Sequence, residues 1–347
     1  MTKDVAGGPA RARLREVAEL AGVHPSTASR ALSGSRVVRP DIAAAVQRAA
    51  EKLNYRVDPI GRALRGERTG TVGMVVPDIV NPFFPAVVQA VEQALHADGR
   101  SLFLCDASND VGVEAERIEA LLDRRVDALL ISPVHQHDSA PAVRRAASRV
   151  PLVQVDRSCV GVGCDFVGVD QAEAMRLLIR HLVDNGRRNL AFVATDDSIS
   201  TVSERIVAYE LHAPNVRSRR RVFRGDLSVE WGARAVDLIL QDTRQPPDAL
   251  ICANDLIALG ALKRLRTHGR QVPGNIAVTG FDDTPFGVLS EPELTSVRQP
   301  VQQIAEEAVH MLGLTRPRST PMAGRRMVLH PALVVRGSSA APAQPPN

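Results

Sequence analysis

The sequence is poor in aromatic residues and cysteine and contains no long apolar run. Only 3% of its 347 residues are Phe, Tyr or Trp, and no apolar stretch approaches the roughly 20 residues that a membrane-spanning helix needs. The first residues carry no hydrophobic signal core. The four cysteines form no Cys-x-x-Cys pair, and no histidine lies at zinc-finger spacing from them. These absences disfavour membrane, secreted and disulfide- or zinc-stabilised proteins, and they predict a protein of the reducing cytoplasm.

Motifs of common enzymes are missing as well. There is no Gly-x-Gly-x-x-Gly after an expected strand, no Walker loop, no Gly-x-Ser-x-Gly elbow and no His-Glu-x-x-His. His135, His137 and Asp138 have metal-binding side chains, but one short cluster without a distant partner is more typical of a polar loop. The sequence predicts a protein that is not an enzyme and has no cofactor and no bound metal.

Positive charge is concentrated at the start of the chain. Residues 1–70 contain 13 Lys/Arg and 7 Asp/Glu, a net charge of +6, whereas the remaining 277 residues carry a net charge of −2. A basic segment attached to a mildly acidic body suggests a module that binds a polyanion, although a solvated basic surface would have the same composition.

The basic segment has the pattern of three short helices. Apolar residues at helical spacing precede Gly22, Pro25 opens a second helix that ends near Gly34, and Pro40-Asp41 opens a third that runs to Leu53. Two short helices joined by a tight turn are typical of a helix-turn-helix, whose second helix enters the DNA major groove. Ser26 and Arg30 lie four residues apart on one face of that second helix.

These side chains suit DNA recognition. Arginine binds guanine O6 and N7 through two hydrogen bonds, and the short hydroxyl side chains of Thr27 and Ser29 are suited to phosphate contacts. Arg30 taken alone would be an ordinary exposed helix arginine.

From Thr71 onward, short apolar strands alternate with amphipathic helices. The pattern predicts a parallel α/β architecture, and about 265 residues are enough for two lobes with a cleft between them. Strands are expected at Thr71 to Pro77, Ser101 to Asp106, Ala128 to Pro133, Leu152 to Asp156, Leu190 to Ala194, Ala249 to Ala253 and Ile276 to Gly280. Helices are expected at Phe84 to Asp98, Val113 to Arg124, Gln171 to Asn185, Asp255 to His268 and Val301 to Leu314.

Motifs in a fixed order carry a family resemblance. In the basic segment they are Glu16-Val17-Ala18, Ala21-Gly22-Val23, Ser26 to Leu32, Leu53-Asn54-Tyr55 and Gly61 to Arg65. In the body they are Val76 to Ile79, Asn81 to Phe84, Arg124 to Asp127, Ala253-Asn254-Asp255, Gly280 to Asp283 and Val297 to Pro300. Residues 12 to about 336 thereby resemble the lactose-repressor/galactose-repressor (LacI-type) family of DNA-binding regulators.

The resemblance implies an all-α helix-turn-helix head and a two-lobed α/β effector domain similar to periplasmic binding proteins. The expected parts are a disordered tail (1–10), the head (11–56), a hinge helix and linker (57–68), the effector-binding and dimerisation domain (69–336) and a second disordered tail (337–347). In the family the hinge helix orders on DNA, and Leu64 of each protomer wedges into a minor-groove step. Leu64 alone would be an interdomain packing residue, and Gly61, where alanine is usual, weakens this helix.

The head departs from the family pattern at several positions. Arg13 and Arg39 replace the usual threonine and serine at two helix starts, so both expected caps are missing; either arginine is a phosphate contact or exposed surface charge. Ala28 stands for a bulkier valine. His24 replaces the usual serine cap of the recognition helix and leaves that cap uncertain. The predicted DNA-binding residues are Arg13, Pro25, Ser26, Thr27, Ser29, Arg30, Gly61 and Leu64.

The resemblance also points to an effector cleft lined from the carboxyl ends of the strands. Its side-chain types suit a sugar or another small polyhydroxylated ligand, although single members also have structural explanations, such as a helix cap for Asp282 or core packing for Phe84. The candidate effector-binding residues are Asn81, Phe83, Phe84, Asp156, Asp170, Arg205, Trp231, Asn254 and Asp282.

The sequence therefore predicts a cytoplasmic transcriptional regulator, a repressor, that binds near-palindromic double-stranded DNA as a homodimer under the control of a small effector. A dimer is favoured over a tetramer because no C-terminal heptad run is visible. A solute-binding protein of a transport system is the alternative with the same two-lobed body, but a basic helical head does not fit it. A sugar-metabolising enzyme is disfavoured by the missing catalytic motifs.

Overall fold

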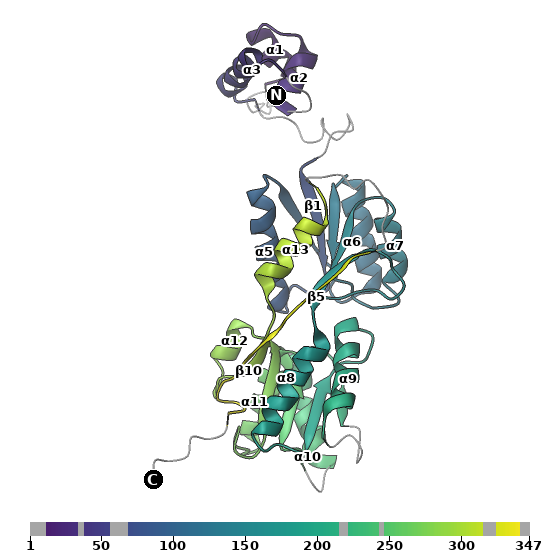
Figure 1. Cartoon of the computed structure of the whole chain (residues 1–347), viewed down its shortest axis with the longest axis vertical. Coiled ribbons are helices and arrows are strands. Elements are labelled where there is room, and N and C mark those ends of the chain that lie inside the picture. Colours follow the sequence, from purple (N-terminus) through teal and green to yellow (C-terminus); the bar gives the residue numbers. More distant parts are fainter. Residues whose placement is uncertain are drawn as a thin grey trace, which may run out of the picture. The chain divides into compact units, whose positions relative to one another are not determined.

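The computed structural model describes residues 12–33, 38–55, 69–214, 221–242, 246–314 and 324–340. The chain divides into two compact units, Met1–Thr69 and Gly70–Asn347, which are called the head and the body below (Figure 1). The predicted N-terminal tail and the predicted hinge, with Gly61 and Leu64, lie outside the described residues.

The head is the predicted three-helix unit. Its helices are α1 (Leu14–Leu20), α2 (Pro25–Ser33) and α3 (Pro40–Lys52). Gly22 has a φ of +66°, the left-handed conformation that ends α1 and turns the chain into α2. The core of the head consists of small and β-branched side chains: Val17, Ala18, Ala28, Val46, Ala49 and Ala50. His24 caps α2, because its Nδ1 accepts the backbone N–H of Ser26 at 3.3 Å.

The first lobe of the body is a six-stranded sheet in the order β11-β5-β4-β3-β1-β2. All neighbouring pairs are parallel. The strands are β1 (Thr71–Val76), β2 (Ser101–Asp106), β3 (Ala128–Ile131), β4 (Leu152–Val155), β5 (Asp165–Val169) and β11 (Arg326–Leu329). The helices are α5 (Phe83–Ala97), α6 (Val111–Asp123), α7 (Ala140–Ala147) and α13 (Val301–Met311).

The second lobe is a six-stranded sheet in the order β12-β10-β9-β8-β6-β7, in which only the β10–β12 pair is antiparallel. The strands are β6 (Leu190–Ala194), β7 (Val222–Arg224), β8 (Ala249–Cys252), β9 (Ala277–Asp282), β10 (Thr295–Arg298) and β12 (Ala332–Val334). The helices are α8 (Gln171–Asp184), α9 (Ser200–His212), α10 (Val229–Asp242), α11 (Asp255–Thr267) and α12 (Pro285–Val288).

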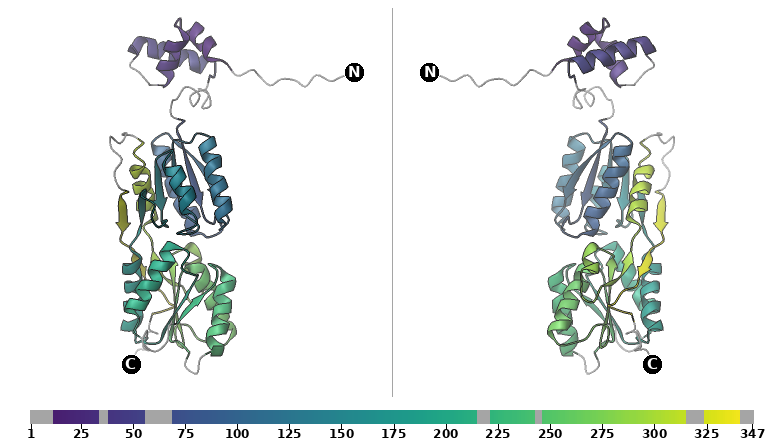
Figure 2. Two further views of the ribbon diagram at one scale, coloured as in Figure 1. Left: turned by 90° about the vertical axis from the view of Figure 1, so that its right-hand side faces the viewer. Right: turned by 90° about the vertical axis from the view of Figure 1, so that its left-hand side faces the viewer.

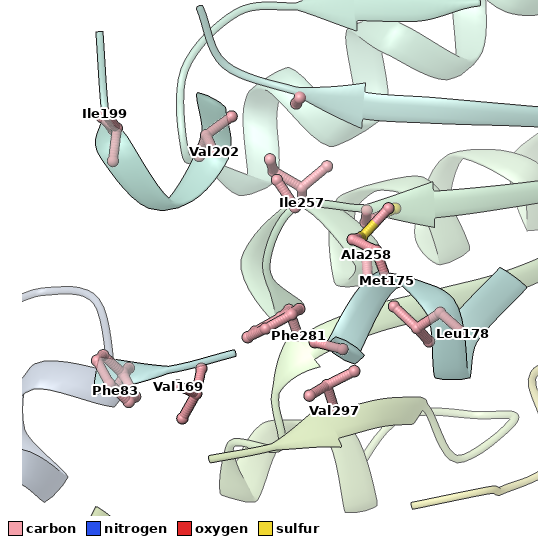
Figure 3. Close-up of a cluster of buried hydrophobic side chains, with 14 of the residues drawn as sticks. Phe83, Val169, Met175, Leu178, Ile199, Val202, Ile257, Ala258, Phe281 and Val297 are labelled. Atoms are coloured by element: carbon pink, nitrogen blue, oxygen red, sulfur yellow. The ribbon is translucent and has the colours of Figure 1, made fainter. Parts of the chain in front are cut away.

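The chain passes between the lobes where β5 leads into α8, where β10 leads into α13 and where β11 leads into β12 (Figures 1 and 2). One hydrophobic cluster continues through both lobes. Figure 3 shows part of it, with Phe83 and Val169 on one side and Phe281 and Val297 on the other. The carboxyl ends of both parallel sheets therefore meet between the lobes, where open parallel sheets bind ligands.

The structure confirms the expected strands and helices of the body and adds others that the sequence pattern did not predict, among them β5, β7, β10, β11 and β12. The prediction of disorder from Gly337 onward is wrong for its first residues. Ser338 and Ser339 are buried, and the Ser338 hydroxyl accepts the backbone N–H of Thr295 at 2.8 Å and donates to the carbonyl of Val278 at 2.6 Å.

Within the described part of the chain, no helix is long and apolar enough to span a membrane.

Candidate effector cleft and DNA-reading face

Side chains from both lobes of the body surround one small cavity. Its volume is about 20 Å³, enough for about one water molecule. The lining residues are Asn81, Phe83, Phe84, Asp156, Arg157, Thr201, Val202, Arg205, Leu227, Ala253, Asn254, Asp282 and Gln299.

The loop after β1 supplies the aromatic wall of the cavity. Asn81 is buried, and its Oδ1 accepts the backbone N–H of Phe83 at 3.2 Å, which fixes the start of α5. Phe83 and Phe84 then pack edge to face, with ring centroids 5.2 Å apart. The sequence pattern Asn-Pro-Phe-Phe thus places two apolar rings at the end of a strand.

Two aspartates reach the cavity from opposite lobes through strained backbone. Asp156 follows β4 with a φ of +64°, and Asp282 ends β9 with a φ of +99°. Residues other than glycine rarely adopt these angles, and such strain is concentrated at functional sites. The Asp282 carboxylate accepts a hydrogen bond from Gln299 Nε2 at 2.8 Å.

Arg205 is held rigidly on α9. Its Nε donates to Gln171 Oε1 at 2.7 Å, its Nη1 donates to the carbonyl of Ala253 at 2.5 Å, and its guanidinium lies 3.3 Å from the centroid of the Phe281 ring. A planar guanidinium fixed in this way presents its remaining N–H groups in one direction, which favours recognition of paired oxygen atoms.

Burial sets the electrostatics of the cavity. It raises the pKa of Asp156, against the attraction of Arg157 and Arg205. It also raises the pKa of Asp282 to about 7, although Arg205 opposes the shift. Burial lowers the pKa of Arg157 and Arg205, and nearby carboxylates counteract this effect. Both aspartates thus lie in surroundings that disfavour their charged form.

Several polar atoms of the lining have no hydrogen-bond partner among the described residues. They are Asp156 Oδ1, Arg157 Nη1, Asn254 Nδ2 and Gln299 Oε1. The cavity therefore offers both donors and acceptors, the set that a hydroxyl-bearing ligand needs, because each hydroxyl group donates one bond and accepts others.

Seven of the nine predicted effector-binding residues line this cavity, and Asp170 and Trp231 are not among its lining. Asp170 caps α8 by accepting the backbone N–H of Glu173 at 2.9 Å. Trp231 is buried in the second lobe, where its indole N–H donates to the carbonyl of Ala194 at 2.9 Å. Their roles in effector binding stay predictions.

The lining also includes polar residues that the sequence reasoning missed: Arg157, Thr201 and Gln299. Two of them had a visible signal. Arg157 follows the predicted strand residue Asp156 directly, and Gln299 lies within the motif Val297 to Pro300 that carried the resemblance.

In the head, α2 exposes the face predicted to read DNA. Pro25, Ser26 and Arg30 are exposed, Thr27 and Ser29 are half-buried, and Ala28 points into the core. Arg30 Nε donates to the carbonyl of Ser26 at 3.0 Å and its Nη2 to the Ser26 hydroxyl at 3.2 Å. These bonds hold the guanidinium along the exposed face of α2.

The start of α1 has no side-chain cap from Arg13, the residue that precedes the helix. Arg13 is exposed, and its backbone N–H donates to the Glu16 carboxylate at 3.2 Å. The position of Arg13 at a helix start fits a phosphate contact.

Comparison with known proteins adds independent evidence. Residues 13–58 match the bacterial regulatory proteins of the lacI family, and residues 179–339 match a periplasmic binding protein-like domain. A protein of Streptomyces limosus, named as an uncharacterized HTH-type transcriptional regulator, is 34% identical over 96% of this chain and 96% of its own length. The chain belongs to the LacI family.

Solved structures agree with this assignment. The transcriptional regulator CelR in complex with cellobiose is 31% identical, covers 94% of this chain and 100% of its own, and superposes with a TM-score of 0.68. The lac repressor dimer bound to operator and the anti-inducer ONPF covers 95% of this chain and 100% of its own with a TM-score of 0.82; at 24% identity it shows the shared fold. This LacI-family chain is thus a DNA-binding transcriptional regulator with a helix-turn-helix head and a two-lobed effector domain.

Proposed function

We propose that the chain is a repressor that binds a near-palindromic operator as a homodimer. A small polyhydroxylated effector that binds in the body determines whether the repressor releases or keeps this operator. The single observation that carries the proposal is the convergence of side chains from both lobes on one polar cavity. A ligand bound there contacts both lobes at once, and because the cavity now has room for only about one water molecule, the lobes must move apart to admit a sugar.

The chemistry of the cavity supports a sugar or sugar derivative. Asp156 and Asp282 accept hydrogen bonds from hydroxyl groups, Arg205 and Asn254 donate to them, and Phe83 and Phe84 cover an apolar ring face. The related regulator CelR binds cellobiose, which is consistent with this ligand class.

The DNA-binding residues that we propose are Arg13, Pro25, Ser26, Thr27, Ser29, Arg30, Gly61 and Leu64. The exposed face of α2 supports the base-reading role of Ser26 and Arg30. A dimer places two such helices on successive major grooves, which makes the operator nearly palindromic.

We propose further that the chain is not an enzyme and acts in the bacterial cytoplasm, where operator DNA lies. Its family consists of bacterial regulatory proteins, and regulation by binding needs no catalytic group.

Selection from a random pool of double-stranded DNA tests the proposal. The purified chain is expected to enrich a near-palindrome, and one compound from a library of sugars and derivatives is expected both to raise the melting temperature and to change operator affinity. A solute-binding protein would bind a sugar without enriching any DNA sequence, and that result would contradict the proposal.

A further inference from the structure

A chain of hydrogen bonds runs along the exposed face of α2 in the head. His24 directly precedes this helix, and its carbonyl accepts the backbone N–H groups of Thr27 at 2.8 Å and Ala28 at 3.1 Å. Its ring nitrogen Nδ1 lies 2.9 Å from the Ser26 hydroxyl, and Arg30 Nη2 donates to the same hydroxyl at 3.2 Å. His24 is therefore linked to Arg30 through Ser26.

The partners of the Ser26 hydroxyl determine where its single proton points. His24 Nδ1 already accepts the backbone N–H of Ser26 at 3.3 Å, so this nitrogen is the unprotonated one of the ring and cannot donate. Arg30 Nη2, by contrast, can only donate. The hydroxyl proton therefore points to His24, and a lone pair of the hydroxyl oxygen accepts the bond from Arg30.

This arrangement determines how Ser26 can meet DNA. A serine hydroxyl that rotates freely can either donate to a base or accept from one. Here the proton is engaged by His24, so the second lone pair of the Ser26 oxygen can only accept. The base groups that donate in the major groove are the N6 amino group of adenine and the N4 amino group of cytosine.

The same bonds orient Arg30. Its Nε donates to the Ser26 carbonyl at 3.0 Å and its Nη2 donates to the hydroxyl, so two bonds fix the plane of the guanidinium. Arginine recognises guanine through two parallel bonds, and a guanidinium that is already oriented loses less conformational freedom on binding. Both bonds are exposed in the free head, and DNA that covers this face excludes water and strengthens them.

The imidazole gives this position a property that serine lacks. The family resemblance has serine where this chain has His24. A serine there could cap α2 equally well, but its hydroxyl both donates and accepts, so it would not fix the direction of the Ser26 proton. His24 Nδ1 only accepts. The replacement therefore changes the chemistry of the DNA-reading face as well as the cap.

We propose that His24 is a positioning residue that sets the base preference of the recognition helix. It accepts the hydrogen bond of the Ser26 hydroxyl, so that Ser26 accepts from an adenine or cytosine amino group while Arg30 is held for guanine. His24 itself needs no contact with a base. This inference rests on the proposed function, because it assumes that α2 reads operator DNA.

The test uses the full chain and the operator that selection from random DNA yields. The variant Ser26→Ala locates the base pair that Ser26 contacts, because the preference at that pair is lost. Inverting this base pair exchanges the amino group for a keto oxygen at the same place in the groove. The parent is expected to bind the inverted operator about tenfold more weakly, because two acceptors then face each other.

The variant His24→Ala releases the Ser26 hydroxyl, which can then turn and donate to the keto oxygen. The preference for the original base pair over the inverted one is expected to fall to about threefold or less. Loss of the cap alone would weaken binding to both operators alike and leave this ratio unchanged. In the Ser26→Ala background, His24→Ala should not change the ratio at all.

Two further variants complete the design. Asparagine places its Oδ1 as many bonds from the backbone as histidine places its Nδ1, and this oxygen also only accepts. His24→Asn is therefore expected to keep both the cap and the parent's ratio. Gln47→Ala, which alters an exposed residue of α3, is the matched control and should bind both operators like the parent.

Three results overturn the inference. His24→Ala keeps the parent's ratio, or Ser26→Ala changes no base preference, or purine in place of adenine (2-pyrimidinone in place of cytosine), which lacks the amino group, leaves the parent's affinity unchanged. In each case an enriched operator still shows that the chain reads DNA, and only the role of His24 fails. If selection enriches no sequence, the proposed function fails and this inference fails with it.

Discussion

At the scale of single residues, Arg30 and Arg13 separate two ways of binding DNA. Arg30 is held along the exposed face of α2 by Ser26, whereas Arg13 is exposed at the start of α1. Arg30→Ala is expected to lose about 1–3 kcal/mol of preference at one base pair of each half-site. Arg13→Ala is expected to weaken binding to all sequences alike. Binding to a set of single-base operator variants measures both effects, and equal losses on every variant for Arg30→Ala would refute the base-reading role.

The pKa of Asp282 predicts how stability depends on pH. Its folded value of about 7 lies above the ordinary value of 3.8. The folded protein therefore retains a proton that the unfolded chain releases, so this contribution to stability is present below about pH 4 and is lost as the pH rises through 7. Asp282→Asn, which cannot ionise, should be more stable than the parent at pH 8, by a few kcal/mol at most.

Urea unfolding at several pH values between 5 and 8 checks this prediction. The stability gained by Asp282→Asn should shrink steadily as the pH falls. Asp184→Asn, which alters an exposed carboxylate of α8, is the control. The same pH profile for both variants would show that Asp282 ionises freely in the folded protein.

The sequence predicted seven of the cavity residues. Six of them lie at the end of a strand or in a motif of fixed order, and Arg205, which lies within a helix, was assigned by its position in the family resemblance. The sequence missed Arg157 because an arginine after a strand is usually exposed, and only the packing against Phe84 shows that this one is buried. Gln299 was missed for a related reason. Its role depends on Asp282, 17 residues away, which is its partner only once β9 and β10 pair.

At the scale of elements, two glycines bring α10 and α11 into close contact. A Cβ atom on Gly232 would lie 2.0 Å from the carbonyl oxygen of Ile257, and one on Gly260 would lie 2.0 Å from that of Val229. Alanine usually stabilises a helix relative to glycine, but here either substitution must push the two helices apart. Gly232→Ala and Gly260→Ala are each expected to lower the free energy of unfolding by about 1–3 kcal/mol.

Gly163→Ala is the matched control, because a Cβ at that position meets nothing within 4 Å and its φ is not positive. It should be neutral or slightly stabilising in urea unfolding. Stabilisation by Gly232→Ala or Gly260→Ala to the same extent would contradict the close approach of the helices.

The strands that the sequence pattern missed are short or depend on distant partners. β7 has three residues and β12 has three, which is too few for a periodic signal. Three of the four residues of β11 are exposed, so the strand has no alternating apolar pattern. It forms because it pairs with β5, about 160 residues earlier in the chain. Ser338 and Ser339 lie in a segment whose composition is typical of a disordered tail. Their hydroxyl groups nevertheless form hydrogen bonds with backbone and side-chain groups of the second lobe.

At the scale of the whole molecule, the uneven charge predicts the salt dependence of DNA binding. Residues 1–70 carry a net charge of +6. Neutralising phosphates releases counterions, so operator affinity is expected to fall on the order of 10³-fold between about 50 and 200 mM salt. Effector affinity should change far less over this range. Operator binding that does not vary with salt would contradict a head that binds through phosphate charge.

DNA binding by the head and effector binding in the cleft are expected to be coupled. The most direct test is to measure operator affinity with and without the effector that the screen identifies, and effector affinity with and without operator. The two ratios must be equal, because coupling between sites is reciprocal. Asp282→Ala is expected to weaken effector binding and to spare operator affinity in the absence of effector, whereas Leu64→Ala is expected to weaken operator binding and to spare effector binding. An effector that binds the free and the operator-bound chain with identical affinity would contradict this coupling.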